Sequence, residues 1–107
     1  MNLRQLEAKF VRRTNEGRQH VSTIAEADGV DFLCPKCYAE QGGPVGTHHI
    51  VCWSPSVPQD VGPGPGRWSM HGNSIDDLTL VAQSCSVKLI GGCEAHFFVK
   101  GGVIEMC

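Results

Sequence analysis

The stretch Phe32-Leu33-Cys34-Pro35-Lys36-Cys37 is the most informative part of this chain of 107 residues. Two cysteines separated by two residues can turn both sulfurs toward one metal ion, and backbone N–H groups stabilise the thiolates. The segment Cys93-Glu94-Ala95-His96 has the same spacing, follows Gly91-Gly92 and runs into an apolar stretch. Together the two segments predict a tetrahedral Zn²⁺ site with the ligands Cys34, Cys37, Cys93 and His96.

Two other interpretations of these cysteines stay open. The two segments can be unrelated buried cysteine sites, or Cys34 and Cys37 can form a redox pair. A thioredoxin-like pair opens a helix after a strand in an α/β unit, and we expect no long helix after Cys37. The 55 residues between Cys37 and Cys93 exceed the spacing of a standard zinc finger. They predict an insertion between two metal-binding knuckles.

The composition is that of a small domain that needs support beyond its core. The chain holds 13 glycines, six prolines and six cysteines, and 41% of its residues are hydrophobic. A domain of this size buries a smaller fraction of its surface on folding than a large domain does, so its hydrophobic core alone gives little stability. The net charge of −2 argues against a strongly basic nucleic-acid binder. The chain contains no apolar run long enough to span a membrane and no signal-peptide core, so we expect a cytoplasmic protein with metal-binding rather than disulfide-bonded cysteines.

The hydrophobic pattern predicts a mainly β fold of small α+β type, in one domain over residues 1–107. Strands are expected at 10–14, 19–22, 47–53, 67–71, 78–82, 86–90, 97–100 and 103–106, with Gly101-Gly102 as a type I′ hairpin turn. Short helices are expected at 2–9 and after a capping box formed by Thr23 and Glu26. The result is a zinc-stapled antiparallel β domain whose core is expected to contain Trp53, Trp68, Leu80, Leu89, Phe97 and Val99.

Two segments stand out by composition. Residues 42–66 contain six glycines and five prolines, and their last part, 54–66, is predicted to be a long Pro/Gly-rich loop. Loops of this length are usually functional or mobile. Residues 1–21 are predicted to form a basic arm that is solvated or contacts an acidic protein surface. Its cations predict only weak nucleic-acid binding at physiological salt; they are Arg4, Lys9, Arg12, Arg13 and Arg18.

His48, His49 and Cys52 lie in one predicted strand. Alternation along a strand points His48, Ile50 and Cys52 to one face, and His49, Val51 and Trp53 to the other. The pair His48 and Cys52 can hold a second metal, place a catalytic imidazole, or be a hydrogen-bonded histidine beside a buried thiol. Four protein ligands fill a zinc site and favour a structural role, so no catalytic residue is assigned. The alternative is a metal-dependent hydrolase or nuclease in which His48 or His49 activates water.

Several segments resemble a family of small zinc-knuckle proteins encoded by phages and prophages. The matching segments are 32–37, 43–48, 51–53, 63–68, 76–79 and 91–93 with His96, within residues 22–107. The resemblance implies a phage or prophage accessory protein in the bacterial host cytoplasm, a zinc-stabilised binding module that acts on a host or phage macromolecule. Some family members carry the label ammonia monooxygenase. We reject that activity, because that enzyme is a membrane-embedded copper protein and a thiolate-rich site favours zinc.

Overall fold

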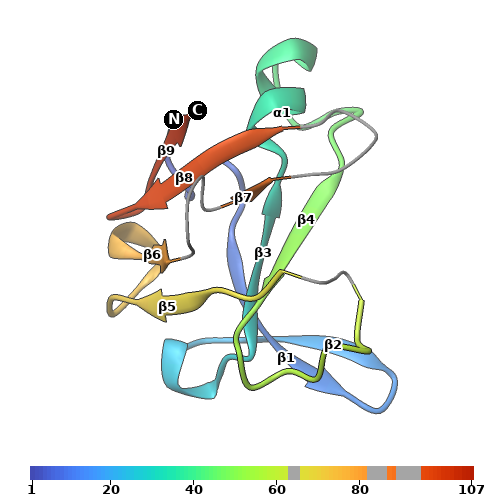
Figure 1. Cartoon of the computed structure of the whole chain (residues 1–107). Helices are drawn as coiled ribbons and strands as arrows, with labels where there is room; N and C mark the ends of the chain where they lie inside the picture. The colour runs from blue at the N-terminus through green and yellow to red at the C-terminus, as the bar shows by residue number, and fades with distance from the viewer. Residues whose placement is uncertain (63–65, 82–86, 89–94) are drawn as a thin grey trace.

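The computed structural model of the chain describes residues 1–62, 66–81, 87–88 and 95–107, with 87 and 88 described by their backbone alone. Two antiparallel sheets make up most of it (Figure 1). The first sheet has the order β2-β1-β3-β4 and consists of β1 (Lys9–Thr14), β2 (Gly17–Val21), β3 (Gly29–Leu33) and β4 (His49–Trp53). The second has the order β5-β6-β8-β7, with β9 also paired to β8; its strands are β5 (Ser69–His71), β6 (Thr79–Val81), β7 (Val87–Lys88), β8 (His96–Lys100) and β9 (Val103–Met106).

Three short helices complete the described fold. They are the 3₁₀-helices η1 (Ile24–Glu26) and η2 (Ile75–Asp77) and the α-helix α1 (Pro35–Gln41). Among the residues described, none of these helices has the length and apolar character needed to cross a membrane. The expectation of a mainly β domain is confirmed.

The main core lies between the two sheets. Phe32 of β3 and Phe97 of β8 contact each other edge to face, with ring centroids 6.0 Å apart. Of the predicted core residues, Leu80, Phe97 and Val99 belong to this cluster, Trp68 packs against it half-buried, and Leu89 lies outside the described residues.

A second, smaller core covers the opposite face of the first sheet. Val11, Val51 and Trp53 lie on that face and are buried together with Val57, which follows β4. Gly29 lies beneath Trp53, where a Cβ atom would come within 2.8 Å of the indole ring. Trp53 is therefore buried as predicted, in this second cluster rather than in the main core.

The predicted helix over residues 2–9 is wrong, because the segment forms turns. The Leu3 amide donates to the Gly102 carbonyl at 2.8 Å, and Glu7 adopts a positive φ of 55°, which ends any helical continuation. Leu3 and Leu6 are fully buried in the main core. The helix-like apolar spacing is thus satisfied by two tight turns packed against the sheets, and residues 1–21 are an integral part of the fold rather than a separate arm.

Of the two local motifs predicted from the sequence, the Gly101-Gly102 turn forms and the Thr23–Glu26 capping box does not. The hairpin of β8 and β9 is confirmed: Gly101 and Gly102 both have positive φ, as a type I′ turn requires. The Thr23 side chain makes no cap hydrogen bond to the backbone of η1; its hydroxyl donates instead to the Glu26 carboxylate at 2.9 Å. The capping box of the described chain is at η2, where Ser74 and Asp77 bond each other's backbone N–H groups.

The described part of the predicted loop, residues 54–62, is tied to the body of the protein by Arg67. The guanidinium donates to the carbonyls of Val57 at 3.0 Å, Pro58 at 2.5 Å and Val61 at 2.9 Å. The Trp53 indole N–H donates to the Gly62 carbonyl at 2.9 Å. These bonds and the buried Val57 give this Pro/Gly-rich segment a defined shape without helix or strand.

Candidate metal centre

The Cys-x-x-Cys segment forms the corner between β3 and α1. Cys34 follows the last residue of β3 and is the N-cap of α1, and Pro35 occupies the first turn, where its missing N–H costs no hydrogen bond. Gly42 ends the helix in a left-handed conformation with φ 72°. The chain then returns, and the Cys34 amide donates to the His48 carbonyl at 2.9 Å. This backbone contact brings the start of β4 against the knuckle.

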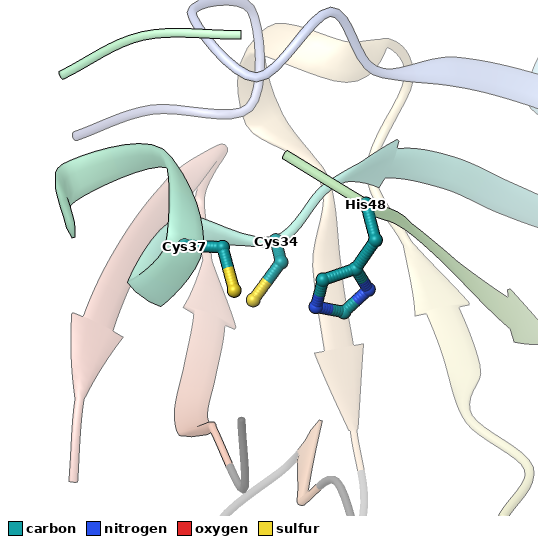
Figure 2. A group of neighbouring side chains, drawn as sticks. All are labelled: Cys34, Cys37 and His48. Carbon is teal, nitrogen blue, oxygen red and sulfur yellow. The ribbon is translucent and has the colours of Figure 1, made fainter. Parts of the chain in front are cut away.

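Three side chains converge at this corner. The sulfurs of Cys34 and Cys37 and a ring nitrogen of His48 all lie within 4.8 Å of one another. Figure 2 shows both sulfurs and the imidazole directed toward a shared space. Cys34 is buried, Cys37 half-buried and His48 exposed, and neither cysteine is in a disulfide bond.

This donor set fits a zinc ion. Tetrahedral bonds of about 2.0–2.3 Å place ligand atoms roughly 3.3–3.8 Å apart, so a contraction of about 1 Å would bring the group into coordination. Two thiolates and an imidazole are typical zinc ligands, whereas hard cations such as Mg²⁺ and Ca²⁺ prefer oxygen. The group is thus compatible with zinc, although the donors alone do not define the metal.

The group shares two members with the predicted ligand set. Cys34 and Cys37 come together as expected, and His48 joins them. Cys93 lies outside the described residues. His96 begins β8 half-buried and is not one of the three, so the four-ligand set stays a prediction. The sequence feature that could have indicated His48 as a ligand is the glycine-rich segment 42–46. There the chain reverses direction and returns to the corner that holds Cys34 and Cys37.

The other cysteines bear on the alternative interpretations. Cys52 is fully buried in the main core, where burial raises the pKa of its thiol, and it is not a member of the group that His48 forms with Cys34 and Cys37. Cys107 is disulfide-bonded, so the expectation of metal-binding rather than disulfide-bonded cysteines is wrong for this residue. A helix does begin directly after Cys34, as in redox pairs. It has only seven residues and follows a strand of an antiparallel sheet rather than of an α/β unit, so the expectation that no long helix follows Cys37 is confirmed.

His49 lies in a different polar cluster. Its Nδ1 atom is 2.6 Å from Oδ1 of Asp31, and the Arg18 guanidinium contacts Oδ2 of the same carboxylate at 3.3 Å. The Asp31 side chain is only 9% exposed, against 55% for His49 and 44% for Arg18. One nearly buried carboxylate therefore connects β2, β3 and β4 and fixes one nitrogen of an exposed imidazole.

Comparisons with protein families, with curated proteins and with solved structures find no match for this chain. The resemblance to phage-encoded zinc-knuckle proteins stays a prediction. The function proposed for this protein is supported by the geometry of the described residues.

Proposed function

We propose that the protein is a zinc-stabilised binding module, a phage or prophage accessory protein that acts on a host or phage macromolecule. The observation that supports this most is the convergence of Cys34, Cys37 and His48 within 4.8 Å. These residues join the β3–α1 corner to the start of β4. A metal held there would stabilise a chain whose two cores are small.

The three ligands have distinct tasks in this proposal. Cys34, at the helix N-cap, and Cys37, in the first turn, are held by α1, whose N-terminal N–H groups favour the thiolate forms. His48 comes from the strand that follows and closes the site. A bound zinc ion would supply folding free energy on the order of 10 kcal/mol.

The contact surface in this proposal is the loop at residues 54–62. Arg67 and Trp53 hold its backbone, while Pro55, Gln59 and Asp60 are exposed. A loop already fixed in one shape loses little conformational entropy when it binds a partner. Its rigidity therefore favours a recognition role.

Point substitutions test this surface better than a deletion, because removing the loop would uncover Val11 and Trp53. The zinc-loaded protein and a Gln59→Ala plus Asp60→Ala variant would each be used to capture partners from a bacterial lysate. We expect the variant to lose a partner that the parent protein and an exposed control, Glu40→Ala, both retain. Identical partners for all three proteins would reject the loop as the contact surface.

A hydrolase or nuclease is the second candidate, and the Asp31–His49 contact favours it. A carboxylate that accepts the Nδ1 proton leaves Nε2 available to accept a proton from water. The neighbouring Arg18 guanidinium suits a phosphodiester substrate. His48 is the weaker candidate base, because it belongs to the metal group.

The test is hydrolysis of bis(p-nitrophenyl) phosphate and of single-stranded RNA by zinc-loaded protein. His49→Gln should abolish turnover without loss of metal. Turnover that is absent from the parent protein, or unchanged in His49→Gln, would reject the hydrolase.

A further inference from the structure

Strand β2 forms an outer edge of the first sheet. It pairs with β1, and within the described residues its backbone makes no hydrogen bond to any other segment. Residues 17–20 are exposed and Val21 is half-buried. In an antiparallel pair, every second residue of the outer strand directs its N–H and C=O groups away from its partner. The edge of β2 therefore presents a row of backbone donors and acceptors to solvent.

Two other outer strands are partly covered on their outer sides. On β4, the Trp53 carbonyl accepts a hydrogen bond from the Trp68 amide at 3.0 Å. β9 is paired along its outer side by the N-terminus, where the Ile104 amide donates to the Met1 carbonyl at 2.9 Å. The open edge of β2 differs from both.

The hairpin that carries this edge is basic on both faces. Arg12 lies opposite Gln19 and Arg13 opposite Arg18, so the two arginines of β1 project from opposite faces beside β2. Within the described residues, the side chains of Arg12 and Arg13 form no ion pair, whereas Arg18 is paired with Asp31. Two acidic side chains lie nearby: Glu16 in the turn, and Asp28, whose Oδ2 accepts a hydrogen bond from the Arg13 amide at 2.8 Å. The side chains of Arg12 and Arg13 are the cations of this hairpin that are available to a partner.

We propose that β2 binds an extended acidic peptide segment of a partner protein, which adds a strand to the first sheet. This inference rests on the proposed binding function and specifies the partner's chemistry. Backbone hydrogen bonds to β2 supply the affinity, and carboxylates on both faces of the peptide meet Arg12 and Arg13.

The same features disfavour two other occupants. A second copy of this chain would bring its own arginine-bearing hairpin beside the first, which is repulsive. Single-stranded nucleic acid binds a cationic groove with aromatic rings for stacking. Here Arg12 and Arg13 lie on opposite faces, and Phe10 is buried in the core.

The experiment is an NMR titration of ¹⁵N-labelled, zinc-loaded full-length protein. The probe is a blocked peptide of about seven residues, rich in Glu with Val between. A matched peptide carries N-methyl groups on alternate amides, which removes backbone donors but keeps every charge. We expect shift changes centred on Gly17–Val21 and at least tenfold weaker binding by the N-methylated peptide. Arg12→Gln should weaken binding severalfold, whereas Glu16→Gln should leave it unchanged or strengthen it.

Four results would overturn the inference. These are no binding at millimolar peptide, equal binding of both peptides, tighter binding of an oligothymidylate at physiological salt, or a protein dimer that forms through β2. The loop variant Gln59→Ala plus Asp60→Ala serves as the separate control. If it loses its captured partner while the peptide fails to bind, the edge proposal fails and the binding module stands.

Discussion

His48 and His49 are consecutive in the chain, yet their imidazoles belong to different clusters on opposite faces of the first sheet. His48 converges with Cys34 and Cys37, and Nδ1 of His49 lies 2.6 Å from the Asp31 carboxylate. The alternation continues along β4, where Ile50 belongs to the main core and Val51 to the second. Substitutions at the two histidines should therefore have separable effects.

Asp31 is expected to contribute to stability through its two partners. Asp31→Ala leaves Arg18 and His49 without their shared acceptor and should lower the free energy of unfolding by about 1–3 kcal/mol. Urea denaturation of zinc-loaded protein measures the loss. The exposed control Asp60→Ala should stay within about 0.5 kcal/mol of the parent. Equal stability of the two variants would contradict this role for Asp31.

Gly29 is expected to tolerate no side chain. A Cβ atom there would lie 2.5 Å from the Cys52 carbonyl oxygen and 2.8 Å from the Trp53 ring. Gly29→Ala should destabilise the protein by about 1–3 kcal/mol or more, because backbone and indole must both move. Gly62→Ala meets nothing within 4 Å and is the matched control. A Gly29→Ala variant as stable as Gly62→Ala in thermal unfolding would show that Trp53 does not lie across this residue.

Arg67 is expected to determine the shape of the loop through its planar group of donors. Arg67→Lys keeps the charge but cannot reach the carbonyls of Val57, Pro58 and Val61 together. Residues 54–62 should loosen, and the stability should fall by roughly 1–3 kcal/mol. Limited proteolysis within the loop and the tryptophan fluorescence, from Trp53 and Trp68, report the change. Unchanged cleavage and emission would mean that the loop keeps its shape without Arg67.

Asp77 gives the acid dependence of stability a defined sign. Hydrogen bonds from the backbone amides of Ser74 and Asn73 hold the pKa of its carboxyl below the ordinary 3.8. A carboxyl with a lowered folded-state pKa stabilises the fold above its unfolded pKa, and the contribution disappears as pH falls through the folded-state pKa. Asp77→Asn should therefore lose stability at neutral pH and depend less on pH below about 4. A parallel pH profile for both proteins would contradict this contribution.

Local patterns in the sequence predicted the features that depend on near neighbours. The Gly101-Gly102 hairpin, the alternation from His48 to Trp53 and the pairing of Cys34 with Cys37 are set by short-range geometry. The turns at Leu3 and Leu6 have an apolar spacing that also suits a helix, and the tertiary contact of Leu3 with Gly102 decides between the two structures.

The features that the sequence did not reveal depend on distant residues. Asp31 meets His49 across 18 positions. No periodicity encodes such contacts. The sequence likewise placed His48 beside Cys52, whereas the reversal after α1 carries it to Cys34 and Cys37.

The central claim is that Cys34, Cys37 and His48 bind one metal ion, and native mass spectrometry tests it most directly when the parent protein is compared with His48→Gln and His49→Gln. All three proteins would be purified without added metal and then titrated with a chelator. We predict one zinc ion per chain in the parent protein and in His49→Gln, and loss of zinc at a much lower chelator concentration in His48→Gln. A parent protein without zinc, or equal retention by His48→Gln and the parent, would contradict this account.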